Sequence, residues 1–340
     1  WVILTSTLST STIITMSSHH WLLAWLGLEL NTLSMLPIIM KPHHPRATEA
    51  ATKYFIVQTT ASMLILFAST LNAWHTGHWN IMLSPNPLAN TIILSATLLK
   101  LGVAPAHLWY PDIMQGTNML TALTLSTWQK LAPLTLLYLT INHAPTTAIL
   151  AVALFSVMVG GWAGLNQTQT RKIMAFSSIA HMGWLLTALT TNPHLATLTL
   201  ITYLMMTTMM FLTLTTTSTK TLQDLSITWS YSPALATMAT ITLMSLGGLP
   251  PLTGFMPKIL ILKELTFINL PLLATALALA SLPSLYFYTR MFYLTIITTP
   301  PNIACTKHNW RFKTNPKTNP MMIAPLATML LPLTPILYTT

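Results

Sequence analysis

The chain alternates long apolar runs with short polar connections. Most of these runs approach the roughly 20 residues that an α-helix needs to cross the hydrocarbon core of a bilayer. They are apolar on every side, whereas the strands of a membrane β-barrel alternate apolar and polar positions. The pattern predicts an all-α polytopic membrane protein with about 11 transmembrane helices, and the apolar segments lie at 1–16, 21–40, 54–72, 91–118, 119–140, 146–164, 172–190, 194–214, 232–268, 270–297 and 320–338.

The longest polar connection between these segments, at about 298–319, is too short to build a water-soluble core. We therefore expect a single membrane domain over residues 1–340. Trp1 already lies within an apolar run, without a charged leading region or a small-residue cleavage site. We accordingly expect neither a signal peptide nor a transit peptide, and we expect that a few residues precede Trp1.

The segments 91–118 and 232–268 are longer than a straight crossing requires, and Gly and Pro interrupt both. Counted as one discontinuous crossing each, they place every basic loop on one side of the membrane, in agreement with the positive-inside tendency. The loops near 17–20, 73–90, 141–145 and 191–193 contain neither Lys nor Arg, and the opposite side has Lys41, Arg46, Lys53, Arg171, Lys172, Lys220, Lys307, Arg311, Lys313 and Lys317. The N-terminus is then expected on the basic side and the C-terminus on the other.

Composition agrees with a membrane location and narrows the chemistry. Only 6% of the residues are charged and 52% are hydrophobic, whereas a soluble domain has about 25% charged residues. The net charge of +10 comes without a basic block, so a nucleic-acid partner is excluded. Cys305 is the only cysteine, and no glycine-rich phosphate loop is present. Any redox cofactor or nucleotide chemistry must therefore belong to a partner chain.

Among the charged side chains within apolar segments, four are the main candidates for a functional role: Glu29, Lys100, Lys130 and Lys258. A lysine at the bilayer centre costs about 2.5–3.5 kcal/mol on insertion scales, so such residues usually face a protein interior or water and mark ion pathways. A buried neutral carboxyl at Glu29 and a snorkelling Lys130 are the structural alternatives.

Other ionisable residues are weaker candidates for a relay. Lys263 and Glu264 are adjacent near the end of a segment, where a solvated helix end is an equal alternative. His107 and His181 lie within apolar segments, and an imidazole can pass a proton between its ring nitrogens. A hydrogen-bonded structural histidine is the commoner case.

The two long segments contain a doubled pattern, KLGVAPAHLWYP (100–111) and SLGGLPPLTGFMP (245–257). Such runs cannot continue as regular helix, and irregular backbone at membrane depth occurs only in the protein interior or beside a wet cavity. The residues expected to break the helices are Gly102, Pro105, Gly247, Gly248, Pro250, Pro251 and Pro257. Because the patterns lie five crossings apart, they predict inverted five-helix repeats, at about 54–140 and 146–297, with 320–338 as the final helix.

Several motifs resemble the antiporter-like membrane-arm subunits of respiratory complex I. They are HHWLLAWLGLELNTLSMLPI, RATEAATKYF, KLGVAPAHLWYPDIMQG, GLNQTQTRKIMAFSSIAHMGW and SLGGLPPLTGFMPK, in this order from about 17 to 297. The family's subunits usually have fourteen helices, and the animal form that this chain resembles lacks the first three. Glu29 resembles the acid of the family's fifth helix, Lys100 the lysine of its broken seventh helix, Lys130 the central lysine of its eighth helix and Lys258 the basic group of its broken twelfth helix. His181 lies near a polar bridging position, which is a weaker match.

The resemblance implies a subunit that takes part in proton translocation across the mitochondrial inner membrane, coupled to electron transfer from NADH to ubiquinone on other subunits. It implies no cofactor on this chain, with FMN and iron–sulfur clusters elsewhere in the complex. The expected partners are neighbouring antiporter-like, small membrane and accessory subunits and phospholipids such as cardiolipin, and the basic loops would face the matrix. Two alternatives are a free-standing cation/proton antiporter and a non-pumping membrane scaffold. Typical Na⁺ coordination relies on acidic residues, and this chain has only five.

Overall fold

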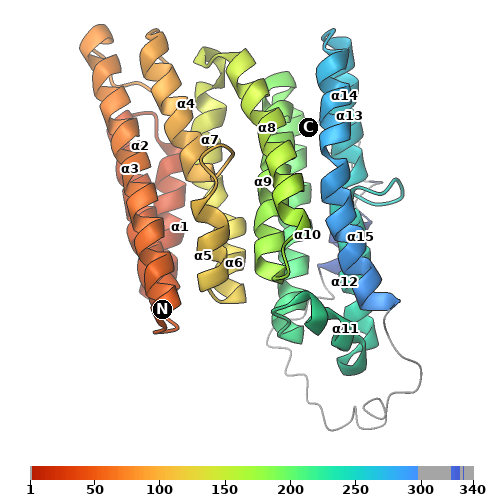
Figure 1. Cartoon of the computed structure of the whole chain (residues 1–340). Coiled ribbons are helices and arrows are strands. Elements are labelled where there is room, and N and C mark those ends of the chain that lie inside the picture. The colour runs from red at the N-terminus through yellow and green to blue at the C-terminus, as the bar shows by residue number, and fades with distance from the viewer. Residues whose placement is uncertain (1, 298–322, 330–331, 333–340) are drawn as a thin grey trace. The chain divides into compact units, whose positions relative to one another are not determined.

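The computed structural model describes residues 2–297, 323–329 and 332, which are almost entirely helical (Figure 1). The fold divides into two compact units, Trp1–Phe155 and Ser156–Thr340, and the boundary falls within helix α8 (Thr146–Leu165). Each unit is described by itself.

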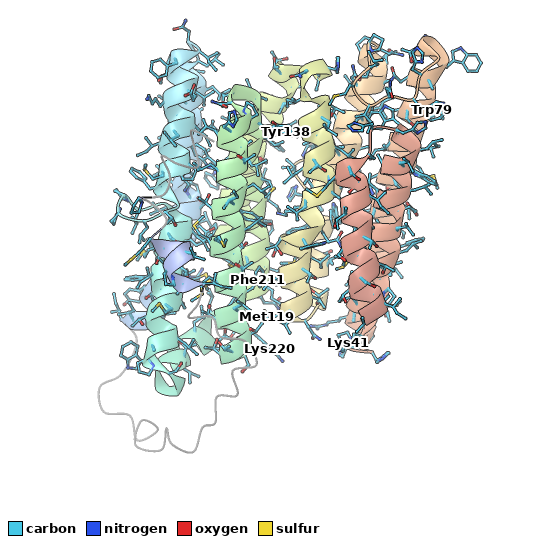
Figure 2. The ribbon with its side chains drawn as sticks, turned by 180° about the vertical axis from the view of Figure 1, so that it is seen from behind. Lys41, Trp79, Met119, Tyr138, Phe211 and Lys220 are labelled. Carbon is cyan, nitrogen blue, oxygen red and sulfur yellow. The ribbon has the colours of Figure 1, made fainter. Side chains whose placement is uncertain are left out.

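The first unit is a bundle of helices that run back and forth between two ends. Its elements are α1 (Val2–Ser17), α2 (Trp21–Met40), α3 (Pro45–Thr76), α4 (Pro87–Leu101), α5 (Trp109–Gly116), α6 (Met119–Ser126), η1 (Trp128–Lys130), α7 (Leu131–Thr140), η2 (Ile141–His143) and the first part of α8. Lys41 and Met119 lie at one end of this bundle and Trp79 and Tyr138 at the other (Figure 2). Helices α2, α3, α4 and α7 share a hydrophobic core around the fully buried Trp21 and Ile65.

Local sequence accounts for where the helices begin. Several N-terminal turns have a side chain that accepts a hydrogen bond from a backbone N–H of the first turn, which satisfies one of the donors that a helix leaves unpaired. These N-cap residues are His20, His44, Asn86 and Asn192. Proline follows three of them, where its missing N–H costs nothing.

The second unit is arranged around α9, the most buried of its long helices. Its elements are the remainder of α8, α9 (Thr170–Thr191), α10 (Pro193–Thr217), α11 (Leu222–Tyr231), α12 (Pro233–Gly247), α13 (Phe255–Phe267), α14 (Pro271–Ala280), α15 (Leu282–Ile296) and α16 (Ala324–Thr328). Helices α10, α13 and α15 all contact α9, and α12 packs on α10 and α15.

The predicted all-α class and both discontinuous helices are confirmed. The segment 91–118 forms α4 and α5, and the segment 232–268 forms α12 and α13. Each of the first ten predicted segments contains helix. The connection 298–319 and most of the last predicted segment, 320–338, lie outside the described residues, and the described part of that segment contains α16. Six helices in the described part are long and apolar enough to span a membrane on their own. The count of eleven crossings stays a prediction.

Two local expectations were wrong or incomplete. The segment 119–140 was expected to be one continuous helix, but a 3₁₀ turn at Trp128–Lys130 divides it into α6 and α7. The Lys130 backbone N–H donates to the Thr127 carbonyl, and Pro133 cannot donate to the carbonyl of Gln129.

Helix α11 was not expected, because its segment is too polar to resemble a crossing. The signal for it is a capping box, in which Thr221 and Asp224 bond each other's backbone N–H groups. The backbone N–H groups of Thr221 and Lys220 donate to the Asp224 carboxylate and hold its pKa below the usual range.

Candidate functional site

Helix α3 contacts both Glu29 and Lys100 from adjacent turns. The partly buried Glu29 of α2 accepts a hydrogen bond through Oε2 from the Ser62 hydroxyl at 2.7 Å. Lys100, in the last turn of α4, is only 6% exposed and donates from Nζ to the Gln58 carbonyl at 3.2 Å. The Gln58 side-chain amide in turn donates to the Lys100 carbonyl at 3.4 Å. The acid and the lysine are therefore held by the same stretch of α3.

Lys130 lies at the interruption between α6 and α7 and is 3% exposed. Its Nζ lies 5.2 Å from the centre of the Tyr110 ring, within the range of a cation–π interaction. The side-chain amide N–H of the preceding residue, Gln129, donates to Asn31 Oδ1 at 3.0 Å. The Tyr54 hydroxyl donates to Gln129 Oε1 at 3.4 Å. These hydrogen bonds tie the interrupted helix to α2 and α3.

Lys100 and Lys130 line one internal cavity of about 20 Å³, together with Tyr54, Gln58, Trp109 and Gln129. A polar cavity needs about 10–15 Å³ to hold a water molecule, so this one has room for a single water. The Trp109 indole N–H is buried and has no hydrogen-bond partner among the described residues. The cavity thus offers donors from several helices at a place where water fits.

The helix breaks in the two units have the same local geometry. Gly102 ends α4 with φ +69°, and Gly248 ends α12 with φ +83°, a left-handed conformation in which glycine carries no Cβ penalty. In both places the residue after this glycine donates back to the helix carbonyl five positions earlier, as in a Schellman motif. Gly248, rather than Gly247, is therefore the structural counterpart of Gly102, one residue later than an alignment of Leu101–Gly102 with Leu246–Gly247 would place it.

Lys258 lies in the first turn of α13, beside the end of α12. Its Nζ donates to the Gly247 carbonyl at 2.9 Å and lies 6.0 Å from the Trp184 ring. Lys258 and His181 line a second internal cavity of about 20 Å³. His181 Nε2 lies 3.4 Å from the Tyr288 hydroxyl and the ring is 5.6 Å from that of Tyr203. The second unit therefore also pairs a lysine beside a broken helix with a water-sized cavity.

The weaker candidates lie elsewhere. His107 follows the first break, where its Nδ1 lies 3.2 Å from the Pro105 carbonyl. It is not among the side chains that line the internal cavity shared by Lys100 and Lys130. Lys263 is exposed and lies over Phe267 at 5.5 Å, and Glu264 is partly buried. Their relay roles stay predictions. Pro105, Pro250 and Pro251 lie in the non-helical connections, and Pro257 lies in the first turn of α13.

A surface cavity of about 280 Å³ lies at one end of α3 and α5 in the first unit. Lys53, on its wall, forms ion pairs with Glu49 at 2.8 Å and with Asp112 at 3.0 Å. Tyr54, the next residue along α3, and Ile113, the residue after Asp112, line the internal cavity. On both helices, a residue beside the surface cavity is therefore followed directly in the sequence by a residue that lines the internal cavity.

Sequence reasoning missed the uncharged polar residues that contact the four charged side chains. Tyr54, Gln58 and Ser62 recur every four residues along α3 and so form one polar stripe. This spacing was a usable signal within an apolar segment. Nothing in the sequence pattern indicated that Tyr110 would lie beneath Lys130.

A family model described as the transmembrane part of NADH:quinone oxidoreductase and Mrp antiporters matches residues 18–283. The chain belongs to this family. A model described as the C-terminus of NADH dehydrogenase subunit 2 matches residues 285–338. NADH-ubiquinone oxidoreductase chain 2 of Carassius auratus is 50% identical to this chain, over 99% of this chain and 97% of that relative.

Solved structures show that the antiporter-like fold of the family is present here. A chain of respiratory complex I from Thermus thermophilus matches with a TM-score of 0.85 at 25% identity, over 99% of this chain and 79% of that chain. A chain of the Mrp complex from Dietzia sp. matches with a TM-score of 0.81 at 17% identity, over 88% of this chain and 61% of that chain. The second likeness concerns the fold alone.

Proposed function

We propose that the chain is a core membrane subunit of respiratory complex I and takes part in proton translocation across the mitochondrial inner membrane. Electron transfer from NADH to ubiquinone, carried out by other subunits, drives the translocation. The observation that carries the proposal is that two buried lysines from different helices, Lys100 and Lys130, line one water-sized cavity. Family membership and the named relatives support the same conclusion.

In the first unit, Glu29, Lys100 and Lys130 are the proton-binding groups. A nearby carboxylate favours the ammonium form of a lysine, whereas burial without that charge favours the neutral amine. Lys100 therefore holds its proton when Glu29 is close and gives it up when Glu29 is held away. A water in the shared cavity, with the indole N–H of Trp109 on its wall, passes the proton between the two lysines.

In the second unit, Lys258 and His181 have the corresponding role. The Gly247 carbonyl at the end of α12 accepts from the Lys258 ammonium, and the negative end of the helix dipole favours the cation there. His181 can take up a proton on one ring nitrogen and release it from the other, with Tyr288 as its hydrogen-bond partner.

The surface cavity beside Lys53 and Asp112 is the access route to the first unit's lysines. Its ionised walls attract water and protons, and Lys53 on its wall is followed directly along α3 by Tyr54, which lines the internal cavity. We place this end of the unit, which includes Lys41 and Arg46, at the matrix side, because basic loops face the side from which the chain is inserted.

The partners of this chain are other subunits of complex I. We assign neighbouring membrane-arm subunits, accessory subunits and cardiolipin to the outer faces of this chain. FMN and the iron–sulfur clusters belong to other subunits. Among the described residues no group of three His, Cys, Asp or Glu side chains is placed to hold a metal ion.

The test replaces Lys130 with Met in the assembled complex, which removes the charge and retains a long apolar side chain. NADH-driven proton uptake in proteoliposomes is expected to fall to near background, while NADH oxidation by an artificial electron acceptor, which does not involve the membrane arm, stays normal. Lys220→Met, at an exposed lysine between α10 and α11, is the matched control and should pump normally. Normal pumping by Lys130→Met would remove the basis of the proposal. Loss of assembly with no intrinsic pumping defect would favour the alternative that the chain is a non-pumping membrane scaffold.

A further inference from the structure

The hydroxyl of Ser62 is placed to control how far apart Glu29 and Lys100 stay. Ser62 is fully buried on α3, one turn after Gln58, and donates to Glu29 Oε2 at 2.7 Å. Gln58 accepts from the Lys100 ammonium through its main-chain carbonyl. One helix therefore anchors the acid and the base separately, at two adjacent turns.

Glu29 is not in contact with Lys100 in this arrangement. Ion pairs at 4.0 Å or less among the described residues include those of Lys53 with Glu49 and with Asp112, and none joins Glu29 to Lys100. The carboxylate is instead bound to a neutral donor, and a hydrogen bond to an ionised group is stronger than one between neutral groups. Ser62 therefore stabilises the separated arrangement of the two charges.

Ser62 also has a second acceptor within reach, the Thr59 carbonyl at 2.9 Å. A hydroxyl carries one proton and can satisfy one of these acceptors at a time. When the Glu29 carboxylate leaves, the hydroxyl can donate to Thr59 and no buried donor is left unpaired, so the exchange avoids the usual penalty for an orphaned group. The serine can thus hold Glu29 and release it at little cost.

We propose that Ser62 is a positioning residue that stabilises the separated arrangement of Glu29 and Lys100 and so determines how readily Lys100 releases its proton. This rests on the proposed function in proton translocation. In Ser62→Ala, Glu29 loses its donor and the balance shifts toward contact with Lys100, which then retains its proton.

The experiment compares Ser62→Ala with Ser69→Ala in the assembled complex. Ser69 lies on the same helix and is 2% exposed, and its hydroxyl donates only to the Leu66 carbonyl of its own helix in the structure. NADH-driven proton uptake is expected to fall about tenfold in Ser62→Ala, since a hydrogen bond to a charged group shifts an equilibrium by about that factor or more. Ser69→Ala should pump at the wild-type rate, and Ser62→Thr, which restores the hydroxyl, should recover much of the activity.

Infrared spectroscopy supplies a readout that would not change if Ser62 had a purely structural role. The carboxylate band of Glu29 is identified as the band that is lost in Glu29→Gln. This band should shift in Ser62→Ala and stay in place in Ser69→Ala. If Ser62→Ala does not assemble, Ser62→Cys, which fits the same space and is a weaker donor, is measured in the same way.

An unmoved Glu29 band with wild-type pumping in Ser62→Ala or Ser62→Cys would overturn the role of Ser62. The same result together with inactive Lys130→Met would leave the translocation function intact, so the two proposals fail separately.

Discussion

For single residues, each of the four main charged candidates has a polar group or an aromatic ring as its neighbour. Ser62 contacts Glu29, Gln58 contacts Lys100, the Tyr110 ring lies beneath Lys130, and Gly247 accepts from Lys258. Among the described residues, Lys100 and Lys258 donate to main-chain carbonyls of Gln58 and Gly247. A buried lysine held by weak partners is easier to deprotonate than one in a tight ion pair, and this suits a group that must release its proton in each cycle.

The Tyr110 ring should matter to Lys130 more than the Tyr110 hydroxyl does. A cation–π interaction contributes about 0.5–2 kcal/mol, so Tyr110→Leu should lower the rate of proton uptake by about 2-fold to 30-fold. Tyr110→Phe, which retains the ring, should stay within about twofold of the wild type. Tyr138→Leu, at a tyrosine that is 45% exposed in α7, is the control in the same proteoliposome assay. Equal loss in the Leu and Phe variants would show that the ring is not what stabilises Lys130.

At the scale of the elements, the helix breaks create the positions that the lysines occupy. The left-handed glycines end α4 and α12 and leave main-chain carbonyls in the protein interior. A continuous helix would use these carbonyls internally. In α12 the last-turn carbonyl of Gly247 holds Lys258, so the break is part of the binding arrangement itself.

Gly248→Ala should disturb Lys258 as well as the backbone, whereas Gly77→Ala should disturb the backbone alone. Both glycines have positive φ, at which an added side chain costs about 1–2 kcal/mol. A Cβ on Gly248 would come within 2.9 Å of Lys258 Nζ, and a Cβ on Gly77 would meet nothing within 4 Å. Both variants should shorten the thermal-inactivation half-life of the complex, but only Gly248→Ala should also impair proton uptake at low temperature. Equal pumping by the two variants would contradict a role for this break in holding Lys258.

At the scale of the whole molecule, orientation in the membrane follows from the loops. Helix α3 has 32 residues, which corresponds to about 48 Å at 1.5 Å per residue and exceeds the roughly 30 Å of the hydrocarbon core. A helix of this length can cross the core and reach water at both ends. The basic residues Arg46 and Lys53 lie near its first turns, and Trp74, which is 88% exposed, lies in its last turn.

Cysteine labelling tests this orientation. In a Cys305→Ser background, which removes the only native cysteine, Thr48→Cys should react with a small impermeant thiol reagent from the matrix side alone. Trp74→Cys should react from the intermembrane-space side alone. Mass spectrometry of inside-out and right-side-out membrane vesicles gives the readout. The reversed pattern would place the basic loops on the intermembrane-space side and would overturn the proposed orientation.

Local sequence was enough to predict the helical class, the two broken helices and the four main charged candidates within apolar segments. These features depend on local chemistry: a run of apolar residues, a glycine or proline that cannot continue a helix, and a charge that is costly in hydrocarbon. The sequence did not indicate the 3₁₀ turn at Trp128–Lys130, or that Gly248 rather than Gly247 takes the left-handed conformation. In each case, neighbouring positions along the chain have nearly equal local conformational preferences.

The neighbours of each charged side chain depend on how the helices pack. Helices that are apolar on every side contain little information about their rotation or depth, so no pattern indicated that Ser62 would contact Glu29 or that Tyr110 would lie beneath Lys130. These contacts join residues far apart in the chain, and packing alone brings them together. The charges were visible in the sequence because each violates a local rule, whereas their partners are ordinary residues until the helices pack.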